Sequence, residues 1–149
     1  MDTSNSFSNV GPHISVERII SHFHRFSIEA PKELIKLLTI TNGGRPVRIL
    51  MSIPNHWDGT DNFVALWGID HPDRNLSYGE NLAYYRHYID QGLLPFGAAD
   101  SGSLICISTR KSDLDQIRYI DIAEAEPSEP YQKTWWLADD LAEFINSLK

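Results

Sequence analysis

Sulfur chemistry and membrane-spanning segments are almost missing from this chain. Cys106 is the only cysteine among 149 residues, which excludes an intramolecular disulfide and a cysteine-based zinc site and is typical of a reducing compartment. No apolar run approaches the ~18 residues that a membrane-spanning helix needs, and the polar first ten residues lack the apolar stretch of a secretory signal. We therefore expect a cytoplasmic protein that does not enter a membrane.

Basic residues are scarce as well. The chain has 13 Lys and Arg residues against 20 Asp and Glu residues, for a formal net charge of -7. Such a surface repels phosphate groups instead of releasing their counterions, so we expect no direct contact with nucleic acid. Seven acidic and two basic residues lie in residues 121–149. This acidity either keeps the protein in solution or attracts a basic partner, and composition leaves both open.

The motifs of nucleotide-binding and hydrolytic enzymes are also absent. No phosphate-cradling loop and no dinucleotide-binding glycine pattern occurs, and Ser101 lacks the glycines that flank a nucleophilic serine at two residues on either side. Cys106 lies in an apolar run, where burial raises the pKa of a thiol and makes it unreactive. We therefore expect a protein that is not an enzyme and binds no cofactor.

One group of residues keeps a catalytic alternative open. Imidazoles and carboxylates that gather near strand ends can bind a divalent metal, and such residues occur in two predicted loops: His56, Asp58, Asp61, Asp70, His71 and Asp73. Their spacing matches no known metal motif, and Asp is common in loops because it favours turns. A metal-dependent enzyme that uses the loops around Asp58, Asp70 and His71 is therefore the less favoured alternative.

The length and composition are those of one soluble globular domain. A chain of 149 residues buries roughly 70% of the surface that its unfolded form exposes. Its content of 42% hydrophobic and 22% charged residues is ordinary for such a domain. We expect a flexible leader over residues 1–12 and a single domain over residues 13–149.

Two helices are predicted to open this domain as a hairpin. The first begins after Ser15, a good N-cap, and its apolar residues recur at helical spacing while His22 is expected to face solvent. The second has Pro31 in its first turn and ends at Asn42-Gly43-Gly44.

The rest of the chain alternates strands with two further helices. A third helix is expected within residues 79–90, and a fourth follows Asp140, which forms a capping-box pattern with Glu143. Apolar and β-branched runs predict strands at residues 47–53, 62–69, 93–96, 104–108, 117–122 and 133–137. The order indicates an α+β fold, with helices packed on a largely antiparallel or mixed sheet.

Three segments in this order resemble those of a known family. They are Asn42-Gly43-Gly44 after the second helix, the apolar Leu93-Leu94-Pro95-Phe96 followed by the turn and strand of residues 100–107, and the final helix after Trp135-Trp136. The chain resembles the SUKH superfamily over roughly residues 14–148. That superfamily includes bacterial toxin-immunity proteins and fungal cell-wall-synthesis regulators.

The resemblance implies a non-enzymatic immunity protein that binds a partner toxin, for which a nuclease is one candidate class, and neutralises it by occlusion. A general protein-interaction or regulatory module similar to the fungal branch is the alternative. The sequence leaves the oligomeric state open. Since a toxin that acts on nucleic acid presents a basic surface, the predicted contacts are mainly acidic or hydroxyl-bearing: Asp100, Ser101, Ser103, Glu124, Glu126 and Glu129.

Trp135 is added to these contacts as the predicted aromatic anchor. Neighbouring residues in a strand point to opposite faces, so we expect one member of the pair Trp135 and Trp136 to lie in the core. The other is expected to be partly exposed or covered by the loop of residues 124–130.

Overall fold

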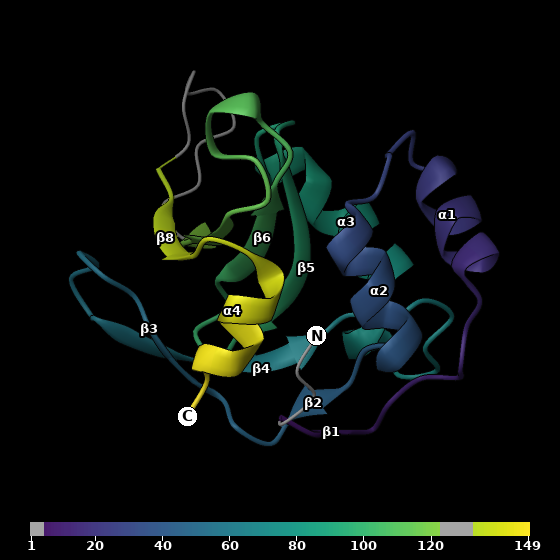
Figure 1. The fold of residues 1–149 in the computed structure, drawn as a ribbon, viewed down its shortest axis with the longest axis horizontal. Helices are drawn as coiled ribbons and strands as arrows, with labels where there is room; N and C mark the ends of the chain where they lie inside the picture. Colours follow the sequence, from purple (N-terminus) through teal and green to yellow (C-terminus); the bar gives the residue numbers. More distant parts are fainter. Residues whose placement is uncertain (1–4, 123–132) are drawn as a thin grey trace.

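The structure, a computed structural model, describes residues 5–122 and 133–149. It is a single α+β domain in which helices pack on an antiparallel sheet of six strands (Figure 1). The strand order is β3-β4-β5-β6-β7-β8, so every strand pairs with its neighbour in the chain. The α+β prediction is confirmed.

The bounds of the elements are as follows. The sheet contains β3 (Leu50–Ser52), β4 (Thr60–Leu66), β5 (Leu93–Ala99), β6 (Leu104–Ser108), β7 (Ile117–Ile120) and β8 (Trp135–Ala138). A separate two-stranded sheet pairs β1 (Phe7–Ser8) with β2 (Arg45–Pro46). The helices are α1 (Val16–His24), α2 (Lys32–Ile40), α3 (Tyr78–Tyr85) and α4 (Leu141–Ser147), with short 3-10 turns η1 (Arg74–Leu76), η2 (Arg86–Tyr88) and η3 (Lys111–Asp113).

The centre of the sheet is the pair β5 and β6. Every residue of β6 is buried, because helices or loops cover both faces of this strand. A bulge at Phe96 interrupts the pairing of β5 with β6, and Gly97 follows it. A Cβ on Gly97 would lie 2.4 Å from the carbonyl oxygen of Ala65, so only glycine allows β4 and β5 to approach this closely.

Helix caps appear where the sequence predicts them. The Ser15 hydroxyl accepts a hydrogen bond from the Arg18 backbone N–H at 3.1 Å and starts α1. Asp140 accepts one from the Glu143 N–H at 2.8 Å and starts α4. Such caps satisfy backbone donors that the helix itself leaves unpaired. Phe144 of α4 then packs against β4 through Phe63, with ring centroids 5.2 Å apart.

The inner face of α1 differs from the prediction, because His22 is buried. Only 5% of its surface is exposed, whereas Val16 and Ile20 are 43% and 37% exposed. The buried side of the helix consists of Ile19, His22 and Phe23, which also have helical spacing. The prediction that His22 faces solvent is therefore wrong.

Aromatic packing explains this position of His22. Its ring lies 5.5 Å from that of Phe26 and 6.1 Å from that of Tyr78. Gly79 leaves room for it, since a Cβ there would lie 3.1 Å from the His22 ring. Neither ring nitrogen has a hydrogen-bond partner among the described residues. Burial, followed by the nearby Arg18 charge, lowers the pKa of His22, so the ring is neutral at neutral pH.

The N-terminal segment also differs from the prediction, which treated residues 1–12 as a flexible leader. Phe7 and Ser8 pair with β2, and Asn5 exchanges two hydrogen bonds of 3.0 Å with the backbone of Arg48. The N–H of Gly11 donates to the carbonyl of Asn42 at 2.9 Å. Residues 5–12 are thus part of the domain, because their backbone groups have partners in it, and residues 1–4 lie outside the described residues.

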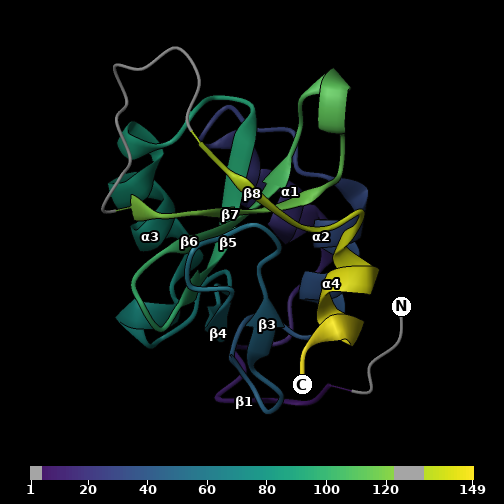
Figure 2. The same ribbon diagram turned by 90° about the vertical axis from the view of Figure 1, so that its left-hand side faces the viewer.

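The outer edge of the sheet at β3 is partly covered by the end of the described chain. The N–H of Leu50 donates to the carbonyl of Lys149 at 3.0 Å, and the N–H of Lys149 donates back at 3.1 Å. Figure 2 shows β3, β7 and β8 on the side of the molecule that faces the viewer, away from α1. Among the described residues, no helix is long and apolar enough to cross a bilayer.

Candidate functional site

The turn between β5 and β6, residues 100–103, projects polar groups from a rigid hairpin. Asp100, Ser101 and Gly102 are exposed. The backbone is fixed by three hydrogen bonds, from Ala99 N–H to Ser103 O (2.8 Å), from Gly102 N–H to Ala99 O (2.9 Å) and from Asp100 N–H to the neighbouring β4 (2.8 Å). Gly102 has a φ of 91°, a conformation that favours glycine.

Asp61 of β4 holds this turn in place. One of its carboxylate oxygens accepts hydrogen bonds from the Ser101 hydroxyl at 2.5 Å and from the Tyr119 hydroxyl at 2.7 Å. The other oxygen accepts from the Asn62 N–H at 2.7 Å. Burial raises the pKa of Tyr119, so its hydroxyl remains a neutral donor at neutral pH. Within the described residues, the Asp61 charge is therefore solvated by neutral donors and is not paired with a cation.

The loop between β3 and β4, residues 53–59, lies beside this turn. Its backbone is closed by a hydrogen bond from Ile53 N–H to Gly59 O at 2.8 Å. Asn55 and Gly59 have positive φ values of 67° and 77°, which bend the chain tightly. The result is a compact loop that buries His56 and leaves Trp57 73% exposed.

His56 is the support on which Trp57 rests. Its ring packs edge-to-face against Tyr119 and Trp135, with centroids 5.3 Å and 4.6 Å away, and stacks on Trp57 at 5.1 Å with an interplanar angle of 27°. The Asp58 N–H donates to Nδ1 of His56 at 3.1 Å. Because Nδ1 accepts, the proton of the neutral ring is on Nε2, which is buried without a hydrogen-bond acceptor among the described residues.

These contacts join the loop and the turn into one surface. Trp57 stacks on His56, His56 contacts Tyr119, and Tyr119 shares Asp61 with Ser101. We name it the Trp57–Ser101 surface, and its exposed or half-buried members are Trp57, Asp58, Asp61, Asp100 and Ser101. No described residue holds the carboxylate of Asp100. The surface combines negative charge, a hydroxyl and one large aromatic ring.

The predicted contacts are only partly brought together here. Asp100 and Ser101 are displayed as expected, whereas Ser103 is 3% exposed and serves the hairpin through its backbone. Glu124, Glu126 and Glu129 lie outside the described residues. Their role as contacts stays a prediction.

Trp135 does not fit the predicted role of an exposed anchor. It is 6% exposed, because His56 and the loop around it cover its ring. Trp136 is half-buried and donates its indole N–H to Asp139 at 3.0 Å. The expectation that one member of the pair lies in the core is thus confirmed. The exposed aromatic residue is instead Trp57. Its position among the turn-forming residues 54–59 is the feature of the sequence that could have predicted this exposure.

Asp70, His71 and Asp73, three of the loop residues considered as metal ligands, make hydrogen bonds within the fold instead. Asp70 forms a double hydrogen bond with the guanidinium of Arg18 at 2.7 and 2.9 Å. His71 accepts from the Asp73 N–H at Nδ1 and therefore donates from Nε2 to the carbonyl of Asn9, at 2.7 Å. Within residues 5–122 and 133–149, no three His, Cys, Asp or Glu residues are placed to hold a metal ion.

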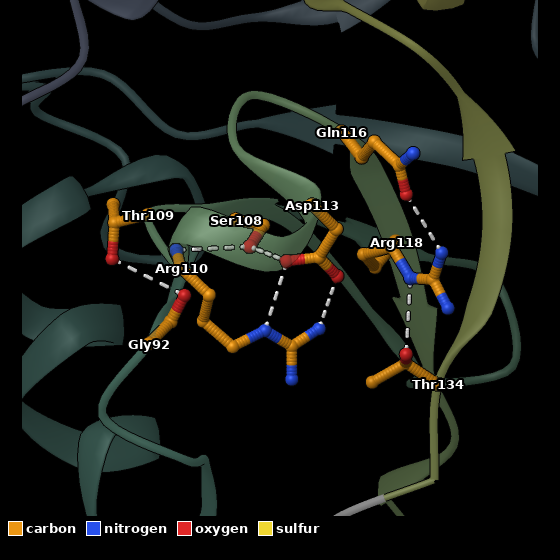
Figure 3. A network of polar contacts seen from close by, with 8 residues as sticks. All are labelled: Gly92, Ser108, Thr109, Arg110, Asp113, Gln116, Arg118 and Thr134. Carbon is orange, nitrogen blue, oxygen red and sulfur yellow. Dashed lines mark hydrogen bonds and ion pairs between the residues drawn. The ribbon is translucent and has the colours of Figure 1, made fainter.

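A second polar network lies at the opposite end of β6, in the hairpin to β7 (Figure 3). Asp113 accepts two hydrogen bonds from the guanidinium of Arg110 and one of 2.5 Å from the hydroxyl of Ser108, which is fully buried. The hydrogen bond from Arg110 lowers the pKa of Asp113. Arg118 donates to Gln116 and to Thr134, which links β7 to the start of β8. The charged side chains of this network, Arg110, Asp113 and Arg118, therefore all have hydrogen-bond partners within the chain.

A groove of about 890 Å³ lies between the α1–α2 connection and the segments before β5 and after β6. Its lining includes the apolar Ile28, Leu93 and Leu94, with Glu29 and Arg86 also present. The groove is concave and shares no residue with the Trp57–Ser101 surface.

Comparison with known proteins assigns the chain to a family. No curated protein matches it. The model of the SMI1 / KNR4 family (SUKH-1) matches residues 14–147, from the buried Ile14 before α1 to the last residue of α4. The family supports an immunity or regulatory type of domain and is associated with protein partners such as toxins. The chain therefore belongs to the SMI1 / KNR4 family (SUKH-1) of the SUKH superfamily.

Proposed function

We propose that this chain is a non-enzymatic immunity protein that binds a partner toxin domain and neutralises it by occlusion. The observation that carries the proposal is the Trp57–Ser101 surface, where Asp100 and Trp57 are exposed on two rigid, mutually braced segments. A braced surface loses little conformational freedom on binding, so more of the contact energy appears as affinity.

Charge supports a basic partner. The net charge of the chain is -7, and Asp58, Asp61 and Asp100 contribute negative charge to this one surface. A nuclease active surface is commonly positive because its substrate is anionic. An acidic protein that docks there competes with nucleic acid and needs no reaction of its own. In a complex of standard size, about 800 Å² of each partner would be buried. Neutralisation of this kind would take place in the cytoplasm of the producing cell.

The test uses the toxin domain encoded beside the gene for this chain. Co-expression should protect cells from that domain, and calorimetric titration of the two purified proteins should give a 1:1 complex. Asp100→Lys should weaken binding about tenfold or more, because a cation replaces an anion within an electrostatically matched interface. Glu29→Lys makes the same charge change in the exposed α1–α2 connection and should leave binding unchanged. Failure of the wild-type protein to bind or protect would refute the proposal.

A general interaction or regulatory module is the second candidate, and the groove of about 890 Å³ favours it. Its apolar lining beside Glu29 and Arg86 suits a peptide segment with mixed character. In that case the same titration would show binding without protection. The complex would then be sensitive to Glu29→Lys and indifferent to Asp100→Lys.

A further inference from the structure

Trp57 is the most exposed large hydrophobic residue among the described residues, at 73%. One face of its indole is occupied by the ring of His56, at 5.1 Å and 27°. No other described residue makes a ring or cation contact with it. Among the described residues, the second face therefore has no ring or cation over it and is open.

The open face is held in a defined direction. His56 itself is fixed by the Asp58 N–H and by the rings of Tyr119 and Trp135, and it cannot turn without losing these contacts. An exposed tryptophan on a braced loop has a small entropic cost of binding, which is the property of an interface anchor.

Other rings of this chain show what Trp57 lacks. The ammonium of Lys133 lies 5.0 Å from the Trp135 ring centre, and the guanidinium of Arg86 lies 5.7 Å from that of Phe26. A cation placed over an aromatic face is attracted by the negative charge of the ring face. Trp57 has the same indole ring as Trp135, the best ring type for such a contact, and within the described chain no cation covers it.

Two carboxylates are tied to Trp57, one through the chain and one through the contacts of Tyr119. Asp58 follows it in the chain and is exposed, and the carboxylate of Asp61 accepts hydrogen bonds only from neutral donors among the residues that the structure describes. A guanidinium is the group that uses both features, since it is planar enough to stack on indole and its N–H groups match a carboxylate. A lysine ammonium is more strongly hydrated and has no planar face.

We propose that the Trp57–Ser101 surface receives an arginine side chain of the partner protein. The guanidinium stacks on the open face of Trp57 and donates to the carboxylate of Asp58. This inference rests on the proposed function in one respect, namely that the toxin supplies the arginine. The binding site itself belongs to this chain and can be examined without the toxin.

The first experiment titrates the ¹⁵N-labelled full chain with Nα-acetyl-arginine amide and follows the tryptophan indole signals by NMR. The Trp57 signal is identified by its loss in Trp57→Phe. It should shift with the arginine compound, with an apparent affinity about threefold or more above that for Nα-acetyl-lysine amide, as expected for a stacked guanidinium. The signals of Trp67, which is buried, and Trp136, which is bonded to Asp139, serve as internal controls.

Asp58→Asn sharpens this measurement. The exposed Asp58 side chain can change without loss of the fold, and its backbone N–H to His56 remains. The arginine affinity should fall about threefold, the usual size of an exposed charge pair. No shift at Trp57, an equal response to lysine or to Nα-acetyl-norleucine amide, or full affinity in Asp58→Asn would each overturn the arginine site.

The second experiment repeats the toxin titration with variants of Trp57. Trp57→Ala should raise the Kd for the toxin about 30-fold, as for an anchor residue. The Kd of Trp57→Phe should lie between those of the wild type and Trp57→Ala, because a Phe ring attracts cations more weakly than an indole. Tyr84→Ala removes another exposed ring, 64% exposed on α3, and should have no effect. Unchanged toxin binding by Trp57→Ala would overturn the arginine site and leave the proposed function standing. If the chain binds the arginine compound but does not bind the toxin, the arginine site would stand and the proposed function would be overturned.

Discussion

The two turns at the ends of β6 use their charges in opposite ways. In the turn to β7, the carboxylate of Asp113 is paired with Arg110 and with the buried Ser108. In the turn from β5, the carboxylate of Asp100 has no partner among the described residues, and the turn is fixed by its backbone and by Asp61. One turn thus uses its charge to stabilise the fold, whereas the carboxylate of the other has no partner within the part of the chain that the structure describes.

Because of this difference, mutations in the two turns should affect different properties of the protein. A group that is paired and largely buried contributes to stability, and its loss leaves its partners unsatisfied. An exposed, unpaired group contributes little to stability and acts mainly on encounter with a charged partner. The comparison therefore predicts stability effects at Asp113 and binding effects at Asp100.

The largest expected effect is that of Asp113→Ala. This change leaves the Ser108 hydroxyl and the Arg110 guanidinium without their acceptor, and should lower the free energy of unfolding by about 2 kcal/mol. Urea denaturation followed by tryptophan fluorescence measures it. Toxin affinity of the folded variant should match that of the wild type. If Asp113→Ala lowered toxin affinity but not stability, the proposed difference between the two turns would be wrong.

An intermediate effect is expected on acidification. The hydrogen bond from Arg110 lowers the pKa of Asp113 in the folded state. The contribution of the ionised Asp113 to the free energy of unfolding is therefore fully present above the ordinary Asp pKa of about 3.9. It is lost as pH falls through the lower, folded-state pKa. The unfolding free energies of the wild type and of Asp113→Ala should therefore converge below about pH 4. A constant difference down to the acid limit would contradict this pairing.

The smallest stability effect belongs to Asp100→Asn. An exposed side chain away from any buried network usually changes stability by less than about 0.5 kcal/mol. Its association rate with the toxin should nevertheless fall, and the fall should diminish at high salt because the lost attraction is screened. Stopped-flow mixing at two salt concentrations measures both. A destabilised Asp100→Asn protein would mean that this turn also depends on its charge.

Local signals predicted much of the fold. The β6 strand lies at the predicted residues 104–108, because an apolar run is bounded by polar turns on both sides. Ser15 and Asp140 cap their helices through hydrogen bonds to residues three positions away. The exposure of Asp100 likewise follows from its place in a short polar turn. Short-range hydrogen bonding and periodicity are what a sequence displays directly.

Long-range packing decided the rest. His56 meets Tyr119 and Trp135 only because β7 and β8 bring those rings under the β3–β4 loop, so neither the burial of Trp135 nor the exposure of Trp57 could be read locally. His22 has the helical spacing of a core residue but is polar, and only the aromatic surroundings provided by Phe26 and Tyr78 place it inside.

The reciprocal pairing of Leu50 with Lys149 has a consequence for self-association. Strands at the margin of a sheet recruit other chains through unpaired peptide groups, which is a route to fibrils. At Leu50 these groups are already engaged by the same chain. Another chain that paired with this margin at Leu50 would first have to displace Lys149, so this contact opposes templated aggregation there.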